Sequence, residues 1–475
     1  MSGTAAPDWI FYVLPLLWPL LGLSTAAHVL LNKRDSKAAF GWIALCIILP
    51  VAGPLIYLLF GINRVHNRAQ REYHVEAPHD ASQTIACPPG TQFKPVSNVG
   101  ANLTGRGLSS CTEFLVLENG EACYPAMIEC INSAQKRVLL ASYIFDHNSC
   151  GLKIVDALVA AMERGVEVKV LVDGLGEFMS FPRIGKRLKQ AGVPFLRFNP
   201  LSLFPPALNI NMRNHRKMLI VDGEWAFTGG QNIGDRHLAD RLDNPHRVHD
   251  IHFRVRGKVV DELEWAFWQD WYYCSRENNP PPFEDSNQQN VNSPIWSRLI
   301  LDGPNNTLDS LNQLLVGIIS AAQEQVLIMT PYFLPTFDLI GALIGAKLRG
   351  VEVQILLPGQ NNISLVHWAM QNTLKQLLEA GLDIRYQPGP FVHSKLLLID
   401  NHYALVGSSN LDPRSLRLNY ELGLELFSDE VNAQLRSYFM RCSEKATPIT
   451  LQAIHGRSLP AKLRDSLAWL FSPYL

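Results

Sequence analysis

The pattern of apolar and polar positions begins with two long uncharged runs. Residues 9–31 and residues 38–60 each span 23 residues without an Asp, Glu, Lys or Arg. At about 1.5 Å rise per residue, a helix of that length is roughly 35 Å long, which exceeds the hydrocarbon core of about 30 Å in a bilayer. We therefore expect residues 1–71 to form a membrane hairpin with helices at about 9–31 and 38–60. Its loop and its far flank carry three Lys or Arg residues each, so the charge bias leaves its orientation open.

After a polar, weakly patterned stretch, the pattern becomes that of alternating strands and helices. Residues 137–145, RVLLASYIF, predict a buried strand, residues 151–164 predict a helix, and the following GVEVKVLVDG predicts a second strand. The same order returns from residues 325–333, QVLIMTPYF, and the pentapeptide RGVEV begins at both Arg164 and Arg349. A repeated order of elements with a repeated sequence indicates a duplicated domain.

The predicted domain organisation follows from this repeat. The polar stretch at 72–110 is expected to be a linker, residues 111–285 the first half and residues 286–475 the second, with a seam rich in Pro and Asn near the boundary. Alternating strands and helices predict an α/β fold in which each half is a mostly parallel sheet flanked by helices.

The C-terminal segment carries apolar residues at helical spacing. They are Leu463, Leu467, Leu470 and Phe471. This spacing predicts an amphipathic segment that lies either on the bilayer or against the core.

Charge and cysteine content narrow the class of protein. The chain carries 42 Lys plus Arg residues against 43 Asp plus Glu residues. Proteins that bind nucleic acid usually have a basic surplus, so we expect no nucleic-acid partner. The 8 cysteines form no Cys-x-x-Cys pair, which favours reduced thiols and a catalytic part on the cytoplasmic side.

One charged constellation, His-x-Lys-x-x-x-x-Asp, occurs twice, each time in an apolar run. Its six residues are His215, Lys217 and Asp222 in the first half and His393, Lys395 and Asp400 in the second. In an extended chain the His and Lys of one copy project from the same face. A His beside a fixed positive charge is half of a phosphate site, and two halves around a pseudo-twofold axis supply a nucleophile on one side of phosphorus and a proton donor on the other. We therefore predict these six as the catalytic residues of a phosphodiester transfer, with the two aspartates as structural or electrostatic partners of the histidines and lysines.

Five further residues support the predicted site. They are Asn232, Ser408 and Asn410 as donors near the transferred group, and Asp250 and Glu421 as carboxylates that orient the histidines. The first half has Gly230 where the second has Ser408, so the hydroxyl comes from one half only. Because the lysines supply the positive charge, we predict no metal and no cofactor. Four histidines between residues 237 and 252 lack metal-site spacing and are expected in a polar loop.

These motifs resemble those of the phospholipase D superfamily, over both halves from about residue 116 onward. Stretches such as RNHRK, FTGGQNIGD and GSSNLDPRSLRLNYE are similar to the bacterial cardiolipin synthase family. The resemblance implies a phosphatidyltransferase that moves the phosphatidyl group of one phosphatidylglycerol onto a histidine, releases glycerol, and passes the group to a second phosphatidylglycerol. It implies His215 as the nucleophile and His393 as the acid. It also implies a multi-pass protein of the bacterial cell membrane, with phospholipid and membrane as partners.

Two other interpretations of the chemistry stay open. A phospholipase D-type hydrolase would use the same motifs with water as the acceptor, because acceptor choice depends on pocket shape and on the exclusion of water. Another phosphatidyltransferase would differ only in its donor or acceptor lipid. The sequence does not specify the oligomeric state.

Overall fold

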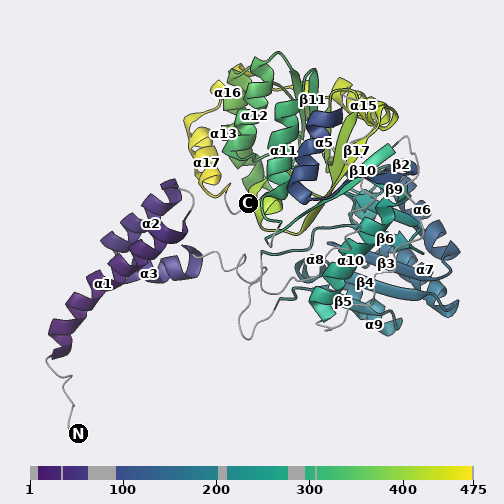
Figure 1. Ribbon diagram of the computed structural model, residues 1–475, viewed down its shortest axis with the longest axis horizontal. Helices are drawn as coiled ribbons and strands as arrows, with labels where there is room; N and C mark the ends of the chain where they lie inside the picture. Colours follow the sequence, from purple (N-terminus) through teal and green to yellow (C-terminus); the bar gives the residue numbers. More distant parts are fainter. Residues whose placement is uncertain are drawn as a thin grey trace, which may run out of the picture. The chain divides into compact units, whose positions relative to one another are not determined.

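The computed structural model describes residues 9–33, 36–61, 93–201, 211–275, 295–304 and 307–472. The chain divides into two units, Met1–Ala69 and Gln70–Leu475 (Figure 1). The predicted boundary between the halves, at residues 285 and 286, lies outside the described residues.

The N-terminal unit is helical. Its elements are α1 (Trp9–Asn32), α2 (Ser36–Ile48), α3 (Ala52–Ile56) and the π-helix η1 (Tyr57–Gly61). The first helix agrees with the predicted segment, but the second, predicted at about 38–60, is interrupted after α2. Pro50 and Pro54 lack the amide hydrogen that a continuous helix needs at these places. Within the described residues, no helix has both the length and the apolar character that a membrane crossing requires.

Helices α1 and α2 pack closely and still leave much apolar surface exposed. A Cβ on Gly22 would lie 2.8 Å from the carbonyl oxygen of Cys46, so a glycine is what lets the two backbones approach. Val29, Cys46 and Tyr57 form a small buried cluster. The large apolar side chains exposed on these two helices include Leu20, Leu21, Leu23, Leu30, Leu31, Phe40, Ile47 and Ile48.

The larger unit contains two sheets that repeat one another. The first has the strand order β2-β9-β7-β6-β3-β4-β5, and the second has the matching order β10-β17-β16-β15-β11-β12-β13 between edge strands β1 and β18. The first-sheet strands are β2 (Glu113–Glu118), β3 (Arg137–Ser142), β4 (Glu167–Asp173), β5 (Phe195–Phe198), β6 (Met218–Val221), β7 (Trp225–Gly229) and β9 (Ile251–Arg256). The second-sheet strands are β1 (Ser109–Cys111), β10 (Ile295–Asp302), β11 (Gln325–Met329), β12 (Glu352–Pro358), β13 (Asp383–Gln387), β15 (Leu396–Ile399), β16 (Tyr403–Gly407), β17 (Glu421–Phe427) and β18 (Thr447–Pro448). The shared order confirms the duplicated α/β domain.

Both sheets are mixed, so the expectation of mostly parallel sheets is wrong. In these two sheets, only β3–β4–β5 and β11–β12–β13 pair in parallel, and the other described pairings are antiparallel. The reason lies in the twin motifs, where β6–β7 and β15–β16 are hairpins. Each turns at the motif aspartate, Asp222 with φ 57° or Asp400 with φ 50°. A strand that returns through a short turn must run antiparallel.

Helices flank the sheets, as Figure 1 shows. They are α5 (Lys94–Thr104), α6 (Asn119–Ser133), α7 (Ser149–Glu163), α8 (Gly174–Met179), α9 (Ile184–Gln190), α10 (Val259–Ser275), α11 (Ser310–Ala321), α12 (Phe337–Leu348), α13 (Ser364–Glu379), α14 (Pro413–Arg417), α15 (Asp429–Glu444), α16 (Leu451–His455), α17 (Leu459–Leu470) and the 3₁₀ turn η3 (Asp235–His237).

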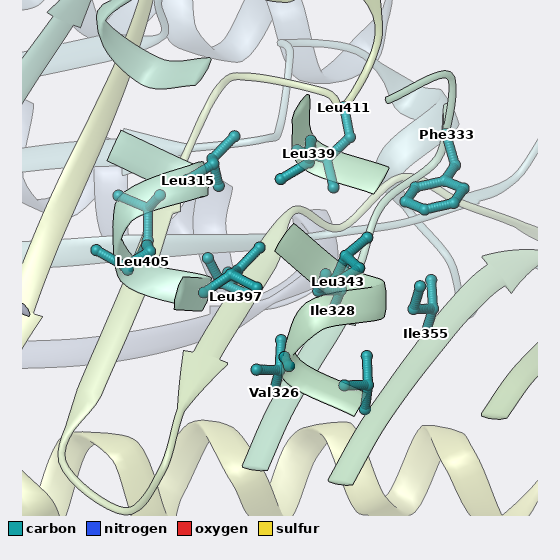
Figure 2. Packing of buried hydrophobic residues seen from close by; sticks show 14 of the residues in the cluster. Leu315, Val326, Ile328, Phe333, Leu339, Leu343, Ile355, Leu397, Leu405 and Leu411 are labelled. Carbon is teal, nitrogen blue, oxygen red and sulfur yellow. The ribbon is translucent and has the colours of Figure 1, made fainter. Parts of the chain in front are cut away.

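The core of the second half lies between its sheet and the helices α11 and α12. Figure 2 shows Leu343 of α12 beside Ile328 of β11, and Leu339 of α12 beside Leu411; Val326 of β11 and Leu315 of α11 belong to the same cluster. Full burial of one such side chain stabilises the fold by about 1.5–3 kcal/mol. An equivalent cluster in the first half joins α6 and α7 to β3 and β4. The motif strands β6 and β15 are therefore internal strands of sheets that pack against helices.

The predicted linker at 72–110 lies outside the described residues up to residue 92, and from residue 94 onward the chain forms α5 and β1, which pack on the second half. Helix α5 packs on α11, where a Cβ on Gly317 would lie 2.5 Å from Val99 Cγ1. Strand β1 pairs with β10. The apolar spacing that buries Val96 was too short to be recognised in a polar stretch.

Candidate active site

The motif histidines and lysines lie just before matching central strands. Lys217 immediately precedes β6, and Lys395 immediately precedes β15. Lys217 Nζ donates to the His215 carbonyl oxygen at 2.7 Å, and Lys395 Nζ donates to the His393 carbonyl oxygen at 2.6 Å. All four residues are buried. Each His–Lys pair is therefore a single unit that presents an imidazole beside an amine.

Short segments of extended chain pair across the two halves. Strand β8 (Val248–His249) of the first half pairs in parallel with β14 (Phe391–Val392) of the second. The His393 amide then donates to the His249 carbonyl oxygen at 2.7 Å. Because Asp250 directly follows β8, this pairing brings a carboxylate of the first half to the histidine of the second.

A matching exchange occurs at the first motif. The His215 amide donates to the Tyr420 carbonyl oxygen at 2.9 Å, and the Tyr420 amide donates to the Arg213 carbonyl oxygen at 2.8 Å. Glu421 directly follows Tyr420, so it lies beside the histidine of the first half. The two exchanges are reciprocal, as a pseudo-twofold relation between the halves requires.

Each histidine is thus paired with a carboxylate of the opposite half. His215 Nδ1 lies 2.9 Å from Glu421 Oε2, and His393 Nδ1 lies 2.8 Å from Asp250 Oδ2. The sequence predicts a carboxylate behind each histidine, and the structure places one there in both half-sites. With Nδ1 of each ring held by a carboxylate, Nε2 is the nitrogen that can face a reacting group, and in the second half-site it lies 3.1 Å from Lys395 Nζ.

The difference between Gly230 and Ser408 has a structural reason. A Cβ on Gly230 would lie 2.5 Å from Asp250 Oδ1, closer than real Cβ contacts come. In the second half, Ser408 Oγ donates to Glu421 Oε2 at 2.5 Å and accepts from the Leu422 amide at 3.0 Å. The serine hydroxyl is therefore engaged by the carboxylate, whereas the sequence suggested a donor to the transferred group.

Burial governs the protonation of the histidines and lysines. Together with Lys217 and Lys395, it lowers the pKa of His215 well below its ordinary value. Burial and then Lys395 lower the pKa of His393 to about 4. Burial lowers the pKa of Lys217 to about 7 and that of Lys395 to about 8. An anionic phosphodiester in the site would raise all four pKa values, because it favours the charged form of each group.

The two carboxylates differ in how firmly they are ionised. Burial raises the pKa of Glu421 to about 7, although Lys217 acts in the opposite direction. Burial also acts to raise the pKa of Asp250, but His393 and Lys395 outweigh it and hold that pKa below its ordinary value. His393 therefore faces a carboxylate, Asp250, that stays ionised. His215 faces a carboxyl group, Glu421, whose pKa is about 7.

The motif aspartates lie at the opposite ends of β6 and β15 from the histidines. The Asp222 carboxylate accepts from the amides of Gln135, Lys136 and Arg137 at 2.8, 2.7 and 2.9 Å. Asp400 accepts from the amides of residues 323–325 in the same way. Of the two roles left open for them, the aspartates therefore have the structural one: they brace the turn and lie away from the reacting groups, so they do not join the catalytic histidines and lysines.

Asn232 and Asn410 lie in matching places after β7 and β16. Asn232 Oδ1 accepts from the Ile144 amide at 3.2 Å, and Asn410 Nδ2 donates to Ser415 Oγ at 3.2 Å. Both asparagines are buried. These bonds hold the loops around the site, and a contact of either amide with substrate stays a prediction.

Two buried ion pairs beside His215 were not identified from the sequence. Arg213 Nη1 lies 3.3 Å from Asp173 Oδ1, and Arg216 Nη1 lies 2.8 Å from Asp270 Oδ1. The available signal is RNHRK, which brackets the first histidine with arginines, whereas the second motif, FVHSK, has none. The first motif therefore contributes two arginines to buried ion pairs, and these arginines have no counterparts in the second motif.

An aromatic ring lies near each histidine. The ring of Tyr143 packs edge-on against that of His215, with centroids 5.0 Å apart, and Tyr332 lies 6.4 Å from His393 in the same sense. Lys217 Nζ lies 5.4 Å from the Tyr143 ring centroid. Each half-site therefore has a half-buried tyrosine ring beside its imidazole.

The histidines at 237–252 do not converge. His237 and His252 are buried, whereas His246 is exposed. The His237 ring centroid lies 6.5 Å from that of His393. Among the described side chains there is no group of three or more His, Cys, Asp or Glu placed to hold a metal ion.

Two family models match the chain. The model for the cardiolipin synthase, PLD-like domain matches residues 127–271 and again residues 315–443. The phospholipase D-nuclease N-terminal model matches residues 20–61. The first model therefore covers more than half of the chain and recognises the two halves separately.

Curated relatives match over nearly the whole chain. A cardiolipin synthase of Geobacillus sp. (strain WCH70) is 30% identical over 94% of this chain and 90% of its own length. Cardiolipin synthase 1 of Bacillus anthracis is 28% identical over 97% of this chain and 93% of its own length. The solved phosphatidylserine synthase of Haemophilus influenzae Rd KW20 has the same fold, with a TM-score of 0.63 at 16% identity, over 80% of this chain and 100% of that chain. The chain belongs to the cardiolipin synthase family of the phospholipase D superfamily.

Proposed function

We propose that this protein is a cardiolipin synthase that transfers a phosphatidyl group from one phosphatidylglycerol to another through a phosphohistidine. The observation that carries the proposal is the pair of His–carboxylate contacts, each formed across the two halves. A double displacement at phosphorus needs two histidines with different tasks around one centre.

In the first step, His215 Nε2 attacks phosphorus, and the bond between phosphorus and the glycerol oxygen breaks. His393 gives its proton to that oxygen, so glycerol leaves as a neutral alcohol. The depressed pKa of His215 keeps its imidazole unprotonated and nucleophilic. The firm Asp250 carboxylate stabilises His393 as an imidazolium once the phosphodiester anion has entered.

In the second step, the terminal hydroxyl of another phosphatidylglycerol gives its proton to His393 and attacks the phosphorus. The bond from phosphorus to His215 Nε2 breaks, which yields cardiolipin and restores both histidines. Lys217 and Lys395, as ammonium groups, offset the negative charge on the nonbridging oxygens in both steps. Because the four side chains are buried, the site has little room for bulk water, which favours a lipid hydroxyl as acceptor.

We further propose that the N-terminal unit anchors the protein in the bacterial cell membrane as a multi-pass segment. The exposed apolar side chains of α1 and α2 fit a hydrocarbon environment. Membrane attachment brings the site to its phospholipid substrates, and the catalytic side is expected to be cytoplasmic.

The deciding experiment uses purified full-length protein with phosphatidylglycerol as the only lipid. We expect cardiolipin and glycerol in equal amounts, and no change when EDTA is present. Phosphatidic acid as the main lipid product would identify a hydrolase. If no product forms until a different phospholipid is added as donor or acceptor, the protein is another phosphatidyltransferase.

The roles of the histidines can be tested by rapid quench. The phosphatidyl label should be found on the peptide that contains His215. Label only on the peptide that contains His393 would reverse the two roles and leave the two-step chemistry intact.

A further inference from the structure

Three apolar side chains project from the turn that ends α8. Phe181 is 96% exposed, Met179 is 65% exposed and Phe178 is 56% exposed. We call these three residues the apolar tip. Large apolar side chains that gather on a surface usually mark a contact with a partner or with a membrane.

The apolar tip is held firmly by its neighbours. Glu177, 3% exposed, pairs with Arg197 at 2.5 Å and accepts from the Gly185 amide at 3.0 Å. Ser180 is buried, and its hydroxyl donates to Asp146. The residues that come directly before Phe178 and directly before Phe181 are therefore fixed in the fold, and the three tip side chains point outward from them.

The same helix is attached to the catalytic site. Asp173 caps α8 by accepting from the Leu175 amide at 2.9 Å, and its other oxygen accepts from the Asn214 amide at 2.9 Å, next to His215. A Cβ on Gly176 would lie 1.7 Å from the Tyr143 carbonyl oxygen, so α8 also lies directly on the residue whose ring contacts His215. Helix α8 is therefore on the rim of the first half-site, and it carries the apolar tip at its C-terminal end.

The chain beyond the apolar tip is basic. Arg183, Lys186 and Lys189 are exposed, and residues 178–190 contain no acidic residue. The Arg183 guanidinium lies 4.9 Å from the Phe178 ring centroid. Apolar side chains beside exposed Lys and Arg match the interface of a bilayer with anionic headgroups. Two copies of this surface would instead bring like charges together, which disfavours self-association through it.

We propose that the apolar tip inserts into the surface of a bilayer that contains anionic phospholipid, with Arg183, Lys186 and Lys189 on the headgroups. This second attachment rests on the proposed function, because it places the rim of the first half-site at the depth from which a phospholipid leaves the bilayer. It is separate from the N-terminal unit, and it positions the site rather than anchoring the chain.

The first experiment reports on insertion and needs no catalysis. The full-length protein carries the photoreactive side chain p-benzoylphenylalanine at Phe181 and is reconstituted in vesicles of phosphatidylglycerol and phosphatidylcholine. The matched control carries it at Leu348, which is 81% exposed and ends α12 near the start of β12, at the opposite end of the strands from His393. We expect lipid adducts at 181 and none at 348. No lipid adduct at 181, or cross-linked protein dimers there in its place, would overturn the proposal.

The second experiment asks what insertion does for turnover. In Phe178→Ser/Met179→Ser/Phe181→Ser, kcat/KM on phosphatidylglycerol vesicles should fall by about tenfold or more, because the apolar contribution to interfacial binding is lost. On short-chain phosphatidylglycerol dispersed in detergent it should stay within about twofold, and Leu348→Ser should match the unmodified protein on both substrates. Equal losses on the two substrates would indicate a structural role and refute the proposal. If the unmodified protein makes no cardiolipin from either substrate, the proposed function is refuted, whereas the adducts at 181 still test insertion.

Discussion

At the scale of single residues, the half-sites differ most at the position where the first half has Gly230 and the second has Ser408. Gly230 leaves room for the Asp250 carboxylate, and Ser408 in the matching place holds Glu421 by a hydrogen bond. An aspartate with a glycine and a glutamate with a serine are therefore two solutions to the same task. They give the histidines carboxylates of different basicity.

Gly230→Ala should remove most of the activity. The added Cβ would meet Asp250 Oδ1 at 2.5 Å, so the carboxylate must leave His393. Loss of an orienting carboxylate lowers turnover by about 100-fold or more. The measurement is kcat on detergent-dispersed phosphatidylglycerol. Gly341→Ala, whose Cβ meets nothing within 4 Å, is the control and should be unchanged. A Gly230→Ala protein as active as the control would contradict the assigned role of Asp250.

The pH dependence should report the buried lysines. Burial lowers the pKa of Lys217 to about 7 and of Lys395 to about 8, so the ammonium forms of the free enzyme are lost as pH rises through this range. Since the substrate is an anion, kcat/KM should fall above about pH 7–8, while the limb in kcat lies at higher pH because bound phosphodiester raises the lysine pKa values. Glu421, with a pKa of about 7, titrates in the same cluster, so the limb belongs to the group as a whole.

Two profiles test this assignment. In Lys395→Arg the guanidinium stays charged, so the fall should become shallower even though turnover is reduced. A value of kcat/KM that stays flat to above about pH 9 in the unmodified protein would show that the lysines are ordinary in the free enzyme.

At the scale of elements, the sequence predicted the local pattern and missed the long-range pairing. The strands and helices around RGVEV were predicted because their apolar periodicity is local. The antiparallel course of β6 and β15 was missed because it depends on the turn at the motif aspartate. The sequence identified Asp250 and Glu421, but it did not show that each contacts the histidine of the opposite half. The backbone contacts that bring them there join segments about 140–200 residues apart.

The last helix bears on an alternative that the sequence left open, a position on the bilayer or against the core. Leu459, Leu463, Leu467 and Leu470 form one stripe of α17 and are 59–69% exposed. The opposite face, with Ala468 at 2% exposure, packs on α13. The leucine stripe therefore does not belong to the core, and a bilayer is the remaining expectation for it.

We expect Leu463→Ser/Leu467→Ser to leave the melting temperature in detergent unchanged, because exposed leucines contribute little to folding. Activity on phosphatidylglycerol vesicles should fall several-fold, with activity in detergent retained. Ala468→Asp is the contrasting variant and should lower the melting temperature, because it places an unpaired charge in a packed contact. A large drop in melting temperature for the double serine variant would assign the stripe to the core after all.

At the scale of the whole molecule, neither half contains both a motif histidine and the carboxylate that orients it. His215 depends on Glu421 of the second half, and His393 depends on Asp250 of the first. One chain therefore contains one site. This organisation makes a prediction about mixtures.

His215→Ala and His393→Ala should each reduce transfer by at least about 1,000-fold in a folded protein. An equal mixture of the two variants should remain inactive, because the exchange takes place within one chain and each molecule lacks one histidine. The assay is cardiolipin formation after the two proteins are co-reconstituted. Recovered activity would mean that halves pair between chains.

The crossed carboxylates also bear on how such a site can arise. A single half-domain could complete its histidine only by pairing with an identical copy, and in that symmetric pair both histidines would have the same neighbours. Covalent joining of the copies removes this constraint, since each position then exists once. Asp250 and Glu421, Gly230 and Ser408, and the arginines found only around His215 are differences that a symmetric ancestor could not hold. The fused chain can therefore dedicate one imidazole to attack and the other to proton transfer.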